Sequence, residues 1–324
     1  MKYSMLQAIN SALRHAMNSE PNVILMGQDI AENGGVFRAT DGLSQVFGKA
    51  RVINSPISEV LMSGMATGMA VAGLKPVIEF QFSGFMLSAV EQLMIHAGRM
   101  RSRTQGRLNC PLVFRAPYGA GIGAPEHHSE SPEALFAHIP GIRVIIPSTP
   151  SRAHGLLLAA INDPDPVVFL EPKKLYHTNE MQVTIGHKQN LDQAIIDQEG
   201  SDLTIIAWGS MLPVVHSASE NCSDISCEII DLCSVYPLDQ ETLISSVKKT
   251  GRVLVVHEAC RTLGLGAEIL AIIAEHCTPY LLSPPQRITG YDMPTPYFKK
   301  EHNFLPKVSQ ISKAICQLME YQHD

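Results

Sequence analysis

The sequence lacks several features that would assign it at once to a broad class of protein. None of its seven cysteines belongs to a C-x-x-C pair, which excludes the zinc and redox motifs built on that spacing and predicts free thiols in a reducing compartment. No uninterrupted apolar run reaches the ~18 residues of a membrane span. Residues 1–17 lack the basic and apolar regions of a secretory signal. We therefore predict a cytoplasmic protein with no membrane partner.

An excess of positive charge is also missing. The chain has 25 Lys and Arg residues against 31 Asp and Glu residues, a formal net charge of −6, which gives no support for nucleic-acid binding. The sequence contains no G-x-S-x-G nucleophile elbow, no Walker A loop and no Gly-Asp-Gly loop for a metal diphosphate. Serine-hydrolase and P-loop chemistry are thus disfavoured.

What the chain does contain is a regular alternation of strands and helices. Its 45% hydrophobic residues are ordinary for a globular protein. Short apolar strands that alternate with helices indicate an α/β fold with mostly parallel sheets flanked by helices. The pattern lapses into polar residues between 181 and 200. We therefore predict two domains, over residues 1–185 and 201–324, joined by a linker at 186–200.

Local patterns predict the individual elements. We expect helices over residues 5–17, 43–47, 84–101, 151–162, 213–219, 239–247, 266–276 and 307–319, and one that begins at Glu59. We expect strands over residues 23–26, 51–53, 77–80, 112–115, 143–146, 167–170, 203–207, 228–231, 253–256 and 280–282.

The stretch around Glu59 is the strongest candidate for a functional site. A predicted strand ends in a turn at Pro56, and Glu59 then begins a helix rich in Gly, Ala and Met. A carboxylate at this place faces the positive end of the helix dipole. It also lies at the carboxyl end of a strand, where open α/β sheets bind ligands. The alternative is an acid that merely suits the dipole.

Two further loops could carry chemistry. The long loop at 116–132 contains three glycines followed by His127 and His128. These histidines could act as general acid–base groups, or they could be a surface pair beside a helix cap. Gly264 and Gly266 resemble part of a dinucleotide fingerprint, but a third glycine and the ribose-binding acid are missing. We favour a tight strand-to-helix turn there.

Taken together, several motifs resemble the beta subunit of the thiamine-diphosphate-dependent 2-oxoacid dehydrogenase (decarboxylating) component. The resemblance covers nearly the whole chain. It rests on residues 27–31 (GQDIA), 35–38 (GVFR), 56–59 (PISE), 79–82 (EFQF), 128–134 (HSESPEA), 140–144 (PGIRV), 169–173 (FLEPK) and 207–209 (AWG). Residues 35–38 and Gln81 are more similar to the branched-chain (2-oxoisovalerate) members than to the pyruvate members.

The resemblance implies a fold, a cofactor and site residues. It implies a pyrimidine-binding domain followed by a transketolase C-terminal-like domain. Glu59 would hydrogen-bond a ring nitrogen of the aminopyrimidine, in an apolar pocket to which Ile57 contributes. Phe85 would pack on that ring and Gln81 would line it. His128 would lie near the substrate carbonyl and serve the reductive acylation of the lipoyl group.

The same resemblance implies partners and metals. An alpha subunit would bind the diphosphate through Mg²⁺, which fits the missing Gly-Asp-Gly loop, and an alpha2beta2 heterotetramer would dock on a lipoyl-bearing acyltransferase core. A potassium ion would be held at Leu112, Ala160, Asp163 and Asp165, unless residues 162–165 form an ordinary turn.

Three alternative functions stay open at this point. The chain could be a pyruvate or acetoin dehydrogenase beta subunit with the same chemistry. It could be a non-catalytic assembly subunit. It could also bind a nicotinamide cofactor through the turn at Gly264.

Overall fold

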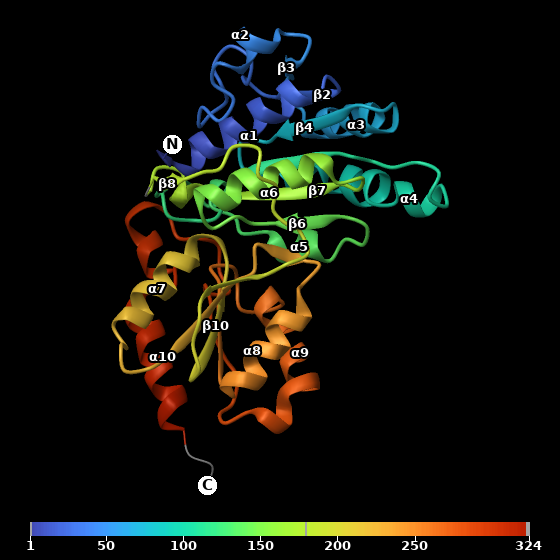
Figure 1. Cartoon of the computed structure of the whole chain (residues 1–324). Helices are drawn as coiled ribbons and strands as arrows, with labels where there is room; N and C mark the ends of the chain where they lie inside the picture. Colours follow the sequence, from blue (N-terminus) through green and yellow to red (C-terminus); the bar gives the residue numbers. More distant parts are fainter. Residues whose placement is uncertain (1, 179, 322–324) are drawn as a thin grey trace.

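The computed structural model describes residues 2–178 and 180–321. Two α/β domains lie one above the other, each built around its own sheet (Figure 1). The seven strands of the first sheet are, in order across it, β12 (Ser234–Tyr236), β6 (Arg143–Ile145), β7 (Val167–Pro172), β5 (Val113–Tyr118), β4 (Lys75–Glu79), β2 (Val23–Gly27) and β3 (Val52–Asn54). All neighbouring pairs are parallel except β12 with β6.

The second sheet has five strands. In order they are β14 (Gln286–Ile288), β13 (Val253–Val256), β10 (Leu203–Ala207), β11 (Cys227–Asp231) and β9 (Ile195–Gln198). Only β9 is antiparallel to its neighbour. A two-stranded ladder joins β1 (Lys2–Tyr3) to β8 (Met181–Gln182). The predicted α/β class with mostly parallel sheets is confirmed.

Helices cover both faces of each sheet. In the first domain these are α1 (Met5–Ser19), α2 (Leu43–Phe47), α3 (Glu59–Val71), α4 (Met100–Arg103), α5 (Glu133–Ala137) and α6 (Pro150–Asn162). In the second they are α7 (Leu212–Glu220), α8 (Gln240–Thr250), α9 (Leu265–Cys277) and α10 (Val308–Glu320). Figure 1 shows α7 and α10 on one side of β10, with α8 and α9 on the other.

Local sequence signals account for several helix ends. Ser4 caps α1 in a capping box with Gln7, which satisfies two of the free N–H groups at the helix start. Thr149 caps α6, and Pro150 follows it at the first helical position, where a missing N–H costs nothing. Gly251 ends α8 with φ of 71°, as a left-handed cap requires.

The hydrophobic core is continuous between the two domains. One cluster of buried residues includes Met26 and Phe136 of the first domain and Trp208 and Ile269 of the second. Separate clusters fill the α1–α6 side of the first sheet and the α7–α10 side of the second. The strand β12, which comes from beyond residue 200, pairs with the first sheet. The second domain therefore packs directly against the first.

Two predicted elements are wrong. The strand expected at 280–282 is absent; a 3₁₀ turn (Thr278–Tyr280) ends there, and the Leu282 N–H donates to the Gly251 carbonyl instead. The edge strand is β14, whose polar residues show no strand pattern. The helix expected at 84–101 divides into η1 (Ser83–Ala89), η2 (Gln92–Ala97) and α4.

The remaining helices and strands lie close to their predicted positions. The expected linker at 186–200 contains β9, and the exact domain boundaries stay a prediction. Four of the seven cysteines are buried, and all seven are free thiols. Within the described ranges no helix is long and apolar enough to cross a membrane.

Candidate functional site

The carboxyl ends of three neighbouring strands meet at one edge of the first sheet. Gly27 at the end of β2 is in register with Asn54 of β3 on one side and with Glu79 of β4 on the other. The loops that follow these strands therefore converge. They form a small recess lined by Gln28, Ser55, Pro56, Ile57, Ser58, Glu59, Met62, Glu79, Phe80 and Gln81. Three of the predicted site residues (Ile57, Glu59 and Gln81) thus lie together.

Glu59 is the first residue of α3, directly after the N-cap Ser58. It is half-buried, and no hydrogen bond or ion pair to its carboxylate is found within the described part of the chain. A carboxylate at a helix start is stabilised by the dipole and by free N–H groups. It is thus left available to an incoming polar group.

The apolar pocket expected around Glu59 is only partly present in the single chain. Met62 is buried, whereas Ile57 and Leu61 expose 77% and 47% of their surface. Val60 and Met65 on the same helix are exposed as well. A group of exposed apolar side chains around a recess is typical of a surface that a partner covers.

A second group of predicted residues forms an aromatic cluster beside the recess. The rings of Phe85 and His128 lie 5.4 Å apart, and Phe82 packs edge-on to His128 with 4.5 Å between ring centroids. His127 lies 5.1 Å from Phe85. Gln81 and Phe82 are adjacent in sequence, so the chain after β4 connects the recess to this cluster. The structure thereby brings Phe85 and His128 together.

One ring nitrogen of His128 is both buried and unpaired within the described ranges. This nitrogen, Nδ1, has no hydrogen-bond partner among the described residues. A buried, unpaired ring nitrogen is uncommon in folded proteins and requires an explanation. A bound ligand group or water at this position would satisfy it.

A buried ion-pair network adjoins the recess through Glu79, which lines it. The sequence analysis did not predict this network. Arg115 on β5 forms an ion pair with Glu79 and a two-point pair with Glu171, with Nε–Oε1 and Nη2–Oε2 distances of 2.7 and 3.0 Å. The Tyr176 hydroxyl donates to Glu171 over 2.6 Å. Burial by itself would lower the pKa of Arg115, but the charges of Glu171 and Glu79 raise it by more, so the net shift is upward. The guanidinium therefore stays charged.

The resemblance motif at 35–38 packs against this network. Gly35 has φ of 79°, and a Cβ there would lie 2.3 Å from the Glu79 carboxylate, so only glycine fits. Phe37 contacts Phe82 and Tyr176, with ring centroids 5.6 and 5.2 Å apart. The motif thus connects the ion-pair network to the aromatic cluster.

The four positions suggested for potassium lie at the opposite ends of the strands. The Asp163 carboxylate accepts the Asp165 N–H and pairs with Arg143 over 2.9 Å, and Asp165 pairs with Arg101 over 2.7 Å. The carbonyls of Leu112 and Ala160 each accept one backbone hydrogen bond. Both carboxylates therefore already have charged or hydrogen-bonding partners in this chain, and a potassium ion at these positions stays a prediction.

The glycines at 264 and 266 have a packing explanation. A Cβ at Gly264 or Gly266 would lie 2.8 or 2.7 Å from the buried ring of His257. That ring stacks on Trp208 at 5.2 Å, and burial lowers the pKa of His257 to about 4. A strand-to-helix turn packed on a neutral histidine accounts for both glycines.

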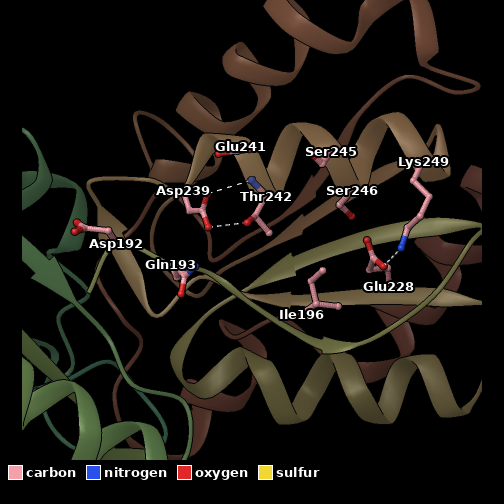
Figure 2. Close-up of a pocket in the computed structure, with 10 residues that line it drawn as sticks. All are labelled: Asp192, Gln193, Ile196, Glu228, Asp239, Glu241, Thr242, Ser245, Ser246 and Lys249. Atoms are coloured by element: carbon pink, nitrogen blue, oxygen red, sulfur yellow. Dashed lines mark hydrogen bonds and ion pairs between the residues drawn. The ribbon is translucent and has the colours of Figure 1, made fainter. Parts of the chain in front are cut away.

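A separate polar cavity of about 550 Å³ lies in the second domain and contains none of the predicted site residues. Figure 2 shows that its charged groups are largely paired: Asp239 accepts from Thr242, and Lys249 pairs with Glu228. We assign no function to it.

Two family models match the chain. The transketolase pyrimidine binding domain covers residues 1–178, and the transketolase C-terminal domain covers residues 192–311. The chain is 44% identical over 318 residues to the pyruvate dehydrogenase E1 component subunit beta of Acholeplasma laidlawii, covering 97% of each chain. It is 41% identical over 334 aligned residues to the 2-oxoisovalerate dehydrogenase subunit beta of Pseudomonas aeruginosa, covering 98% of this chain and 95% of the relative.

The chain belongs to the family of 2-oxoacid dehydrogenase beta subunits. A solved split-gene transketolase, described as an inactive beta4 tetramer, matches the whole chain with a TM-score of 0.80 at 18% identity, and shows the same fold. The family and the two transketolase-like domains are therefore confirmed. The beta-subunit relatives carry both pyruvate and 2-oxoisovalerate names, so they do not favour the branched-chain prediction over its alternative.

Proposed function

We propose that this beta subunit supplies the pyrimidine-binding half of a thiamine diphosphate site in a 2-oxoacid dehydrogenase. The observation that carries the proposal is the unengaged carboxylate of Glu59, which starts α3 and shares its recess with Gln81 and Ile57. The exposed apolar side chains around it fit an alpha subunit that closes the site. The assembly would be an alpha2beta2 heterotetramer that delivers acyl groups to a lipoyl-bearing acyltransferase.

The residues present fit the cofactor's pyrimidine. Thiamine diphosphate, when bound, supplies the electron sink for decarboxylation of a 2-oxoacid. The Glu59 carboxyl would hold a proton against the ring nitrogen. Phe85 would pack on the ring face and Gln81 on its edge. His128, with its unsatisfied nitrogen, would lie near the substrate carbonyl and would accept or donate a proton during acyl transfer to the lipoyl group.

Neither metal of this proposal, Mg²⁺ or K⁺, would be bound by the proposed catalytic residues of this chain. Mg²⁺ would be bound by the alpha subunit, since this chain has no Gly-Asp-Gly loop. Potassium fits less well, because Arg143 and Arg101 already neutralise Asp163 and Asp165. The cytoplasmic location stays a prediction.

Branched-chain and pyruvate substrates are separated by a direct test. The chain is co-expressed with its alpha subunit, and decarboxylation of 3-methyl-2-oxobutanoate and pyruvate is measured with thiamine diphosphate and Mg²⁺. We expect Glu59→Gln to abolish activity on either acid. Glu220→Gln, an exposed position at the end of α7, is the matched control and should be fully active.

Each result distinguishes one alternative. Turnover of pyruvate alone would keep the mechanism and overturn the branched-chain assignment. Full activity of Glu59→Gln would support the non-catalytic assembly subunit instead. Tight NAD binding to the isolated chain would favour the nicotinamide alternative, which the packing of Gly264 on His257 argues against.

A further inference from the structure

The loop that carries His127 and His128 is held by a carboxylate from the other domain. Glu301 lies in η7 (Phe298–Asn303), some 180 residues further along the chain. Its Oε1 accepts the Gly121 N–H and its Oε2 accepts the Gly123 N–H, both over 2.8 Å. Glu301 is only 6% exposed. One buried side chain therefore fixes the loop at two points.

The glycines make this arrangement possible. Gly121 and Gly123 have φ of 114° and 68°, a backbone conformation that other residues rarely adopt. Two alternate N–H groups can then converge on a single carboxylate. Hydrogen bonds to an ionised acceptor are about twice as strong as neutral ones. Glu301 is thus a two-point polar link between this loop and the second domain, next to the Glu258 carboxylate, which accepts the Ala120 N–H.

Neighbouring contacts extend the same link. Phe304 and Leu305 pack on Ala120 in a small buried cluster. At the other end of the loop, the Thr295 hydroxyl donates to the Ser129 carbonyl over 3.3 Å. Residues 295–305 of the second domain therefore hold the loop on both sides of the histidines.

The histidine side chains themselves have no hydrogen bond to the second domain within the described ranges. His128 is positioned by ring contacts with Phe82 and Phe85 and by its backbone, whose N–H donates to the Pro125 carbonyl over 2.9 Å. The place of the ring therefore depends on these ring contacts together with the conformation of the loop. The strand-end recess around Glu59, by contrast, has no Glu301 contact.

We propose that Glu301 is a positioning residue for acyl transfer, which it supports by fixing the loop so that the His128 ring stays in place. This inference rests on the role of His128 in the proposed function. It gives the second domain a part in the reaction. Because the loop does not contain Glu59, Glu301 should affect the step that uses His128 more than decarboxylation itself.

The test uses the full complex with the alpha subunit and a lipoyl domain. Acylation of the lipoyl domain and decarboxylation with an artificial electron acceptor are measured separately for wild type, Glu301→Ala, Glu301→Gln and His128→Ala. A displacement of ~1 Å can reduce a rate by about 100-fold, so we expect Glu301→Ala to reduce acylation by about 10- to 100-fold. Dye-linked decarboxylation should change by less than about threefold.

Hydrogen–deuterium exchange supplies a readout that does not depend on activity. Exchange in peptides covering residues 119–129 should rise by about tenfold or more in Glu301→Ala, since two amides lose their acceptor. Glu301→Gln keeps one acceptor oxygen, so its exchange rate in these peptides should lie between those of wild type and Glu301→Ala. Lys300→Ala changes the exposed neighbouring residue and should match wild type in every measurement.

The outcomes separate this inference from the proposed function. Unchanged exchange in Glu301→Ala, or an equal fall in both activities, would overturn the positioning role. If His128→Ala acylates normally, the proposed function of His128 fails, and with it the link from Glu301 to catalysis. If only His128→Ala loses acylation, the function of His128 stands and Glu301 is not its positioning residue.

Discussion

Arg115 Nε lies 2.7 Å from Glu171 Oε1 in the interior of the first domain, where neither side chain has more than 2% of its surface exposed. The same guanidinium pairs with Glu79, whose neighbours line the recess of Glu59. The Arg115 guanidinium on β5 thereby links strands β4 and β7 next to the candidate site. The arrangement explains why charged residues occupy strands that are otherwise apolar.

Removing this cation should be strongly destabilising. Arg115→Met leaves two buried carboxylates without a cation, and loss of one member of a buried ion pair typically costs about 3–5 kcal/mol. Arg101→Met is the control, because its side chain and that of Asp165 are 43% and 34% exposed, and such a solvent-accessible pair should contribute about 1 kcal/mol or less. Urea denaturation of both variants measures the difference. Similar losses in the two would contradict the importance of the buried network.

Gly35 should be far less tolerant of substitution than a glycine of similar backbone conformation elsewhere. Gly35→Ala combines the left-handed φ of 79° with a Cβ 2.3 Å from the Glu79 carboxylate, whereas Gly106→Ala has φ of 77° and open space around it. The shared backbone term is about 1–2 kcal/mol. The clash should add roughly 1–3 kcal/mol more for Gly35→Ala. Equal unfolding free energies for the two variants would show that Glu79 moves without cost.

The raised pKa of Glu133 should make the stability of the chain depend on pH. Glu133 is fully buried and accepts a hydrogen bond from Trp208 over 3.3 Å, and burial raises its pKa from 4.5 to about 8. Between these values the folded chain retains a proton that the unfolded chain releases, so this group makes stability fall as pH rises from 4.5 to 8.

The matching variant is Glu133→Gln, which keeps the acceptor oxygen and cannot ionise. Its stability relative to wild type should increase from pH 5 to pH 8, by roughly 2–5 kcal/mol over the full window. Chemical denaturation at several pH values measures the difference, with Glu220→Gln as the control. A pH-independent difference would show that Glu133 ionises normally in the folded chain.

The exposed face of α3 should be needed for assembly and not for folding. Leu61→Glu places a charge among Ile57, Val60 and Met65, all at least 45% exposed. Surface substitutions of this kind usually change stability by less than about 0.5 kcal/mol, whereas burying an unpaired charge in an interface should weaken alpha-subunit binding by at least about tenfold.

Co-purification and titration with the alpha subunit test this prediction, and Ile185→Glu, at an exposed apolar position away from α3, is the control. Unimpaired assembly of Leu61→Glu would place the alpha subunit on another surface. Because this chain would hold only the pyrimidine-binding half of the site, we also expect the isolated chain to bind thiamine diphosphate weakly, which calorimetry can measure.

Sequence patterns predicted most helices and the central strands because those signals are local. The capping residues of α1 and α6 and the apolar runs of β2, β5 and β10 lie within the elements that they specify. The edge strands β9, β12 and β14 were missed, since their polar or very short segments become strands only by pairing with a neighbour. The helix expected at 84–101 was misjudged where Gly84 lies against the backbone of His127.

The sequence by itself determined the family, the alternation of elements and the place of Glu59 at the start of α3, because each depends on residues close together in the chain. Only the tertiary structure decided how Arg115 pairs with Glu79 and Glu171, 36 and 56 residues away, and how Glu301 reaches Gly121 across 180 residues. Such contacts leave no periodic signal. They exist because parallel strands bring their ends to one edge and the second domain packs against the loop beside it.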